Sequence, residues 1–248
     1  MSYIKKTITC CGEIEIIKFY GGMLGNHSKR GNAKKAAESV LKKVEKHNFK
    51  MAAKKLYNLL RANFDAGDWH LALTYRPDID VTPDGAEKEM HNFLKRLRYR
   101  CKKDGITLKY IWNTDVSAKG KIHHHIILPK AISLQTLDGL WRLGRVHDNS
   151  RLYPDKDFYG LACYLIDPSH KGELPDTHVK NKKRYKCSNN LIRPVVDYEI
   201  IHAARWSAAP RAPKGYRIKP DSLYNSIDDF TGYPYQSYVL IPDLVRRI

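Results

Sequence analysis

The sequence lacks any apolar run long enough to cross a membrane as a helix. Such a helix needs roughly 18 or more consecutive apolar residues, whereas the mean hydropathy of this chain is -0.54. Residues 1–6 carry charges with no apolar core behind them, so we expect no secretory signal. The pattern is typical of a globular protein in an aqueous compartment.

Cysteine is scarce and scattered. The chain has five cysteines and no CxxC pair, which argues against a disulfide scaffold and a cysteine zinc site. We therefore expect a reduced, cytoplasmic protein. A phosphate loop of the form GxxxxGK[ST] is also missing, so we expect no Walker-type motor in this sequence.

Positive charge is abundant instead. Lysine and arginine number 44 against 26 acidic residues, giving a net charge of +18 in 248 residues. With 42% hydrophobic residues the chain is long and apolar enough for one large or two small domains. A basic excess on a folded chain indicates a polyanionic partner, most often nucleic acid.

Half of this charge lies in the first quarter of the chain. We interpret residues 1–65 as a basic, mainly helical segment, with a helix over 33–60 whose lysines include Lys42 and Lys43. Such a face can contact a phosphate backbone, and a merely solvated face is the alternative.

The middle of the chain, residues 66–200, has the pattern of an α+β domain. Alternation predicts strands at 69–75, 108–116 and 121–128, and helical spacing predicts helices near 86–104, 134–143 and 156–166. This order favours a central antiparallel sheet with helices packed on one face. Residues 201–248 form a C-terminal extension to which the sequence assigns no role.

The most informative stretch is Gly120 to Leu128, which contains three consecutive histidines. Because side chains alternate along a strand, His123 and His125 share one face while His124 lies on the other. Two imidazoles two residues apart can reach one metal ion. A packed strand with polar outliers is the alternative.

Asp115 lies across the short turn from these histidines and can complete a two-histidine, one-carboxylate site. Such mixed ligands suit Mg²⁺ or Mn²⁺ acting on a phosphate, and zinc also remains open. Turn capping is the alternative role for Asp115. His70, on the neighbouring strand, is a less favoured third ligand.

A tyrosine follows on the helix over 157–166. Tyr164 lies on the flank of the apolar face of that helix, whereas Tyr159 points about 160° away from it. If the metal lies on the covered face of the sheet, Tyr164 can approach it and Tyr159 mostly cannot. A core tyrosine with a bonded hydroxyl is the alternative.

These segments resemble, in order and spacing, the three motifs of HUH endonucleases: LALTY at 71–75, D-x4-G-x2-H-x-H at 115–125, and Tyr164. The likeness is closest to rolling-circle replication initiators of plasmids, filamentous phages and integrative elements. The stretches 15–18 and 183–194 are also similar to this group, so the resemblance covers most of residues 10–195.

The resemblance implies a metal-dependent nicking-joining endonuclease acting on single-stranded DNA at a replication origin. His123, His125 and Asp115 would hold Mn²⁺ or Mg²⁺, and Tyr164 would form a 5′-phosphotyrosyl link. The motif normally places a lysine three residues after the tyrosine, where this chain has Asp167. Lys171 follows later, Asp167 can serve as ligand, base or helix end, and Tyr159 is the reserve nucleophile.

A second basic group surrounds Tyr185, a combination that suits phosphates and stacked bases of single-stranded DNA. Its members are Lys180, Lys182, Lys183, Arg184 and Lys186. Three other hypotheses remain open: a non-catalytic nucleic-acid-binding sheet, a zinc-stabilised domain, and a relaxase or single-tyrosine transposase with the same chemistry. A host helicase and polymerase are further candidate partners.

Overall fold

The computed structural model describes residues 2–20, 37–117, 119–152, 157–167, 184–227 and 232–243, and only the backbone of 37–44 and 149. The chain divides into two compact units, one of Met1–Asn48 with Arg193–Ile248 and one of Phe49–Ile192. Antiparallel sheets and helices make it an α+β protein, as predicted.

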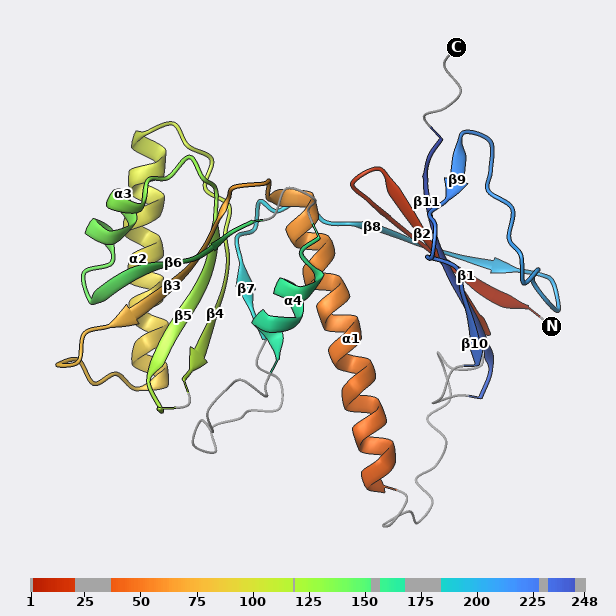
Figure 1. Cartoon of the computed structure of the whole chain (residues 1–248), viewed down its shortest axis with the longest axis horizontal. Helices are drawn as coiled ribbons and strands as arrows, with labels where there is room; N and C mark the ends of the chain where they lie inside the picture. The colour runs from red at the N-terminus through yellow and green to blue at the C-terminus, as the bar shows by residue number, and fades with distance from the viewer. Residues whose placement is uncertain are drawn as a thin grey trace. The chain divides into compact units, whose positions relative to one another are not determined.

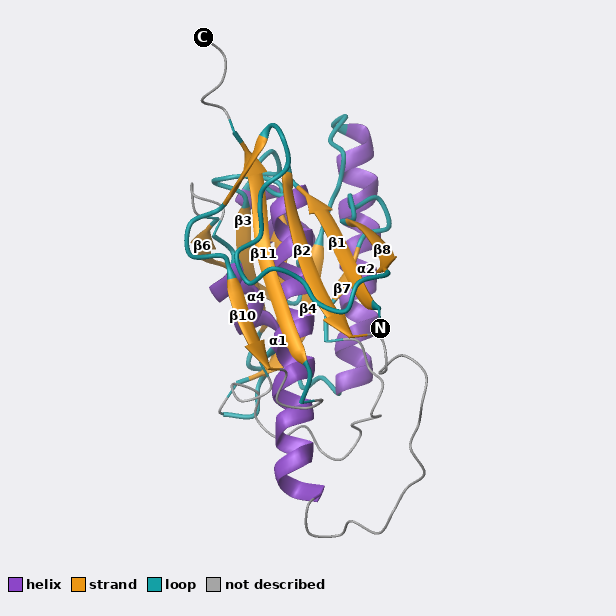
Figure 2. Ribbon diagram, turned by 90° about the vertical axis from the view of Figure 1, so that its right-hand side faces the viewer, coloured by secondary structure: helices purple, strands orange, loops and turns teal. Residues whose placement is uncertain are grey.

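The first unit is built on an antiparallel sheet that joins the two ends of the sequence (Figure 2). The strand order is β10-β11-β2-β1-β8, and β9 pairs with β11. The strands are β1 (Tyr3–Cys10), β2 (Glu13–Tyr20), β8 (Val195–Ile201), β9 (Tyr216–Ile218), β10 (Tyr224–Ile227) and β11 (Pro234–Pro242).

The prediction of a mainly helical N-terminal segment is wrong for residues 3–20, which form the β1–β2 hairpin. Two residues, Cys11 and Gly12, make its turn, with φ angles of 53° and 76°. Positive φ at both positions is the geometry that closes a two-residue hairpin with the natural twist of the strands. Alternation of Ile4, Ile8 and Ile16 with polar residues was the overlooked strand signal.

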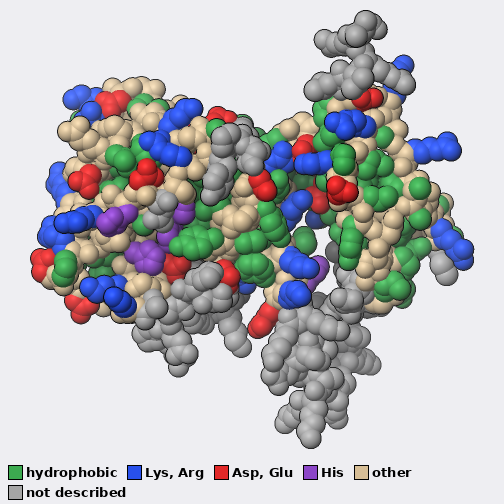
Figure 3. Space-filling model, viewed as in Figure 1, with side chains coloured by type: hydrophobic (Ala, Val, Ile, Leu, Met, Phe, Trp, Pro, Cys, Tyr) green, Lys and Arg blue, Asp and Glu red, His purple; other side chains and the backbone are tan. Residues whose placement is uncertain are grey.

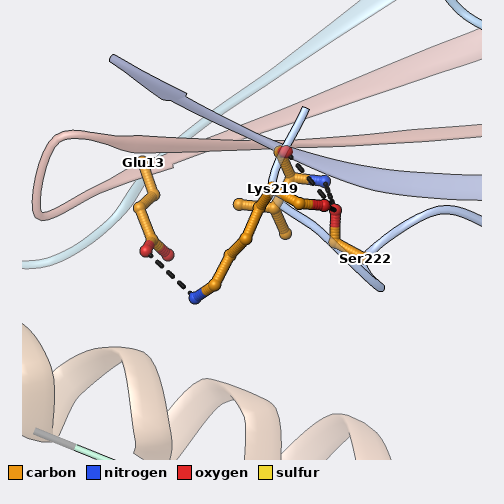
Figure 4. Close-up of polar contacts among 4 residues, drawn as sticks. Glu13, Lys219 and Ser222 are labelled. Carbon is orange, nitrogen blue, oxygen red and sulfur yellow. Dashed lines mark hydrogen bonds and ion pairs between the residues drawn. The ribbon is translucent and has the colours of Figure 1, made fainter. Parts of the chain in front are cut away.

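Polar contacts fasten the β9–β10 connection to this sheet (Figure 4). The Lys219 ammonium lies 3.3 Å from a carboxylate oxygen of Glu13, and its backbone N–H donates to the carbonyl of Val239 at 2.8 Å. The Ser222 hydroxyl donates to the carbonyl of Lys219 and accepts from the N–H of Val239. The C-terminal extension is therefore an integral layer of the first unit.

The second unit is built on a five-stranded antiparallel sheet with the order β6-β3-β5-β4-β7. Its strands are β3 (Trp69–Tyr75), β4 (Ile111–Val116), β5 (Ile122–Leu128), β6 (Gly144–Arg151) and β7 (Lys186–Cys187). Its helices are α2 (Pro83–Lys103), α3 (Leu134–Leu140), α4 (Tyr159–Ile166) and the second half of α1 (Ala37–Asn63).

Helices cover both faces of this sheet, so the expectation of one covered face is wrong (Figure 1). On one face α2 and α3 pack with Leu71, Trp112 and Ile126 into a buried core. On the other, α1 and α4 pack against Ile111 and Ile127. The strands thus carry apolar side chains on both faces, which is why their sequences read as nearly continuous apolar runs.

The predicted helices are present with adjusted ends. Thr82 caps α2 by accepting from the N–H of Gly85 at 3.2 Å, and Asp104 ends the helix as expected. None of the helices in the described ranges combines the length and apolarity needed to cross a membrane.

Strand β6 was not predicted, and a glycine explains how it reaches the sheet. A Cβ atom on Gly144 would clash with the backbone carbonyl of Thr74, so no larger residue fits at this register. Gly144 therefore begins a strand pairing with Tyr75, instead of simply ending the preceding helix.

Candidate metal centre and its tyrosine

The site lies on the face of the second sheet that α1 and α4 cover, near the β4–β5 turn. In the β4–β5 register, Asp115 pairs directly with His123, as the sequence predicted. The turn between them is closed by Gly120, whose N–H donates to the carbonyl of Ser117 at 2.8 Å. With a φ of 72°, this position favours glycine.

The predicted proximity of Asp115, His123 and His125 is confirmed. One ligand atom from each lies within 4.8 Å of the others. Asp115 and His125 are buried, at 4% and 2% exposure, whereas His123 is partly exposed. This cluster can hold a metal ion, and its open side lies at His123.

Each imidazole presents its Nε2 atom to the site and has a partner behind it. Nδ1 of His123 lies 3.4 Å from the carbonyl of Lys121, and Nδ1 of His125 lies 3.3 Å from Nε2 of His70. A proton on Nδ1 of His123 donates to that carbonyl and leaves Nε2 as a lone pair. Such partners behind a histidine fix the tautomer that a metal needs.

The spacing of the two Nε2 atoms, 3.2 Å, fits a shared ion. Metal–nitrogen bonds of about 2.1 Å, meeting at tetrahedral or octahedral angles, place two ligating nitrogens about 3.0–3.4 Å apart. The carboxylate of Asp115 adds an anionic oxygen to the same point. Two imidazoles and one carboxylate suit several divalent ions.

His70 supports His125 rather than belonging to the cluster itself. Its Nδ1 atom lies 3.1 Å from the hydroxyl of Ser150, while its Nε2 faces His125. Burial lowers the pKa of His70 to about 4, so the ring is neutral near pH 7. His70 thus orients His125, a role that the sequence did not indicate.

His124 lies on the opposite face, as the alternation predicted. It is fully buried, with Nε2 at 2.8 Å from the Tyr75 hydroxyl and Nδ1 at 2.9 Å from the Thr114 hydroxyl. The rings of Trp112 and Trp141 pack against it. Burial, and to a smaller extent nearby His123, lowers its pKa to about 3, so His124 is a neutral core residue.

Tyr164 comes to the site from α4, as the helical spacing predicted. Its hydroxyl lies 3.3 Å from Nε2 of His125, the nitrogen that faces the cluster. The side chain is 38% exposed, so the hydroxyl is sheltered but reachable. Partial burial raises the pKa of Tyr164, and the negative charge of Asp115 raises it further, so the phenol is protonated near pH 7.

Asn113 connects this tyrosine to the sheet, a role that sequence reasoning missed. Its amide N–H donates to the carbonyl of Leu165 at 2.8 Å, next to Tyr164 in the last turn of α4. Terminal helix carbonyls lack partners within the helix. Asn113 also pairs with His125 in the β4–β5 register. An isolated asparagine in an apolar strand was the only available signal.

The reserve candidates lie elsewhere. Tyr159 packs its ring edge-on against Tyr57 at 5.8 Å, away from the histidines. Asp167 ends α4, its N–H donating to the carbonyl of Tyr164, and is outside the metal-capable cluster found among the described residues. Lys171 lies outside the described residues.

The structure places only some of the predicted DNA-contacting residues. Arg184 lies over the ring of Phe49. Lys186 forms an ion pair with Glu87 and lies over Trp112, on the face of the sheet opposite the metal-capable cluster. Its contacts are those of a structural residue, and a role in DNA binding stays a prediction. Lys180, Lys182 and Lys183, and the side chains of Lys42 and Lys43, lie outside the described part of the chain.

The surface of the second unit carries a visible gathering of histidine side chains (Figure 3). The polar half of the site face explains this gathering, because His147 on β6 pairs with Ala72 opposite His125 and is exposed. The apolar half of the same face lies under α1 and α4. A polar strip at the strand ends therefore borders the cluster.

Comparison with known proteins agrees with this geometry over part of the chain. Residues 68–167 match the model of a family described as Replication-associated protein ORF2. Comparisons with curated proteins and with solved structures found no match. The matched segment contains β3, the β4–β5 hairpin and α4, and hence the whole cluster and its tyrosine. This likeness supports a replication-associated protein of the Rep type.

Proposed function

We propose that the second unit is a metal-dependent endonuclease that nicks and rejoins single-stranded DNA to initiate rolling-circle replication. One observation carries the proposal: a tyrosine hydroxyl lies 3.3 Å from a histidine of a metal-capable Asp115–His123–His125 cluster. The match to a replication-associated family over the same residues supports it.

In this mechanism Tyr164 is the nucleophile. Its phenolic oxygen attacks the scissile phosphorus as the bond to the 3′-oxygen breaks, and the phenolic proton is ultimately replaced by one on the departing 3′-oxygen through solvent. The products are a 5′-phosphotyrosyl link and a free 3′-hydroxyl that a host polymerase can extend. Attack by a 3′-hydroxyl on the link reverses the step, so rejoining needs no nucleotide cofactor.

The site residues divide the remaining work. His123, His125 and Asp115 would hold Mn²⁺ or Mg²⁺, which would polarise the phosphate and offset the negative charge that Asp115 places near the phenol. His70 keeps His125 oriented, and Asn113 keeps the end of α4 against the sheet. These residues fix the tyrosine and the phosphate-binding point relative to each other.

Two structural facts argue against the other hypotheses. A binding sheet that stacks bases needs an open face, yet helices cover most of both faces here. A structural zinc site closes with four protein ligands, and the cluster among the described residues has three. A relaxase or transposase shares the proposed chemistry, and the family match favours replication over both.

The test is formation of a covalent protein–DNA adduct. The protein is incubated with Mn²⁺ and a pool of random single-stranded DNA, and adducts that resist SDS are measured. We expect metal-dependent adducts that Tyr164→Phe abolishes. Tyr159→Phe is the matched control, because it removes an equally exposed hydroxyl from the same helix. Wild-type adduct levels in Tyr164→Phe, or no adduct with any metal, would contradict the proposal.

A further inference from the structure

A pocket of about 580 Å³ opens beside the metal-capable cluster within the second unit. Its walls are the end of β3 with the loop leading to α2, and the β4–β5 turn with the first residues of β5. His123, the most exposed member of the cluster, is one of the lining residues. The volume lies within the range typical of small-ligand sites, about 300–1,000 Å³.

The pocket combines an apolar wall with two cations. Ile79, Val81 and Ile122 supply apolar surface, and Arg76 and Lys121 supply positive charge. Surfaces that bind single-stranded nucleic acid pair these properties, one for the base and one for the phosphate. A nucleotide therefore fits the pocket chemically.

Hydrogen bonds hold both cations in place at their backbones or heads. Arg76 donates through its guanidinium to the carbonyl of Arg142 at 3.1 Å and lies 3.4 Å from a carboxylate oxygen of Asp78. Lys121 follows the turn at Gly120, and its N–H donates to the Ser117 hydroxyl at 3.1 Å. The positive charges thus belong to ordered loops on opposite sides of the opening.

The position of Tyr164 fixes which nucleotide the pocket would receive. The hydroxyl of Tyr164 contacts His125, His125 contacts His123 and His123 borders the pocket. Attacking and leaving oxygens lie roughly in line across a transferring phosphoryl group. A phosphate at the cluster, attacked from the Tyr164 side, therefore directs its leaving 3′-oxygen toward the pocket.

We propose that this pocket binds the nucleotide on the 5′ side of the cleaved bond, the one that leaves with the free 3′-hydroxyl. The inference rests on the proposed nicking function and adds its polarity and specificity. The base lies against the apolar wall, and Arg76 and Lys121 contact the preceding phosphate. Base preference at the nick is then set on the 3′-hydroxyl side.

The experiment sequences both ends of every cleaved molecule in the random pool. Wild-type protein is compared with Arg76→Ala/Lys121→Ala and with a charge-matched control, Lys102→Ala/Lys103→Ala. The control lysines are exposed at the far end of α2, about 30 Å along the helix from its first residue near the pocket. Melting curves verify that each variant is folded, and Lys121→Ala alone provides a milder version.

We expect the strongest base preference at the last nucleotide before the nick, and we expect the pocket variant to lose it. An oligonucleotide ending at that nucleotide should bind the pocket variant about tenfold more weakly, and the control variant unchanged. Adducts whose preference lies on the phosphotyrosyl side, or survives in the pocket variant, would overturn the pocket while leaving the nicking function intact. Absence of adducts with wild-type protein would overturn the nicking function itself.

Discussion

His124 and His125 are neighbours in the chain, yet the two faces of the sheet give them opposite roles. His124 is enclosed by two tryptophans and bonded through both ring nitrogens to hydroxyl groups. His125 faces a carboxylate, another imidazole and a tyrosine. The comparison teaches that a histidine becomes a candidate ligand when one nitrogen is oriented from behind and the other faces a shared point.

The difference between the faces arises from what covers them. On the α2 face, apolar packing continues along the strand, so a polar ring must be satisfied locally. On the α4 face, packing by α1 and α4 covers Ile127 and Ile111, and the polar residues cluster toward the strand ends. The site lies where the second core ends.

Removing the imidazole from the α4 face should have the largest effect. His125→Ala deletes a ligand, and because loss of a supporting partner alone weakens metal affinity about 10–100-fold, we expect a loss of more than about 100-fold. Titration calorimetry with Mn²⁺ measures it. Metal affinity within threefold of wild type would remove His125 from the ligand set.

Removing the imidazole from the α2 face should act on stability instead. His124→Ala leaves a cavity and two unpaired hydroxyls, and we expect a loss of about 2–4 kcal/mol in the free energy of unfolding. Urea denaturation in EDTA measures it. If the folded variant also lost most of its metal affinity, the separation of the two faces would be wrong.

The residues behind each histidine sharpen the same contrast. His70→Ala removes the partner of His125, and we expect about 10–100-fold weaker metal binding. Tyr75→Phe removes the partner of His124 and serves as the control, with a loss of about 1 kcal/mol in stability and unchanged affinity. Equal losses of affinity in both variants would contradict the assignment.

Asn113 should have the smallest effect and one confined to the tyrosine. In Asn113→Ala the carbonyl of Leu165 loses its donor, so we expect about tenfold slower adduct formation with metal affinity retained. Single-turnover rates at saturating DNA, measured beside Mn²⁺ affinity, separate the two quantities. An unchanged rate in the folded variant would show that α4 is held by packing alone.

Local patterns predicted much of the second unit because its information is local. Alternation placed His123 and His125 on one face, the short turn brought Asp115 opposite His123, and helical spacing separated Tyr164 from Tyr159. Periods of 2 and 3.6 residues determine such relations within one hairpin or one helix. The first unit was missed because β1 pairs with β8 and β2 with β11, partners from opposite ends of the chain.

By itself, then, the sequence determined the α+β class, the basic charge and the cluster of Asp115, His123 and His125, because each depends on composition or on neighbours a few residues apart. Only the tertiary structure decided that His70 lies behind His125, that Asn113 holds α4, and that Arg76 and Lys121 border one pocket. These relations join separate strands, loops and helices, and packing alone sets the distances between them.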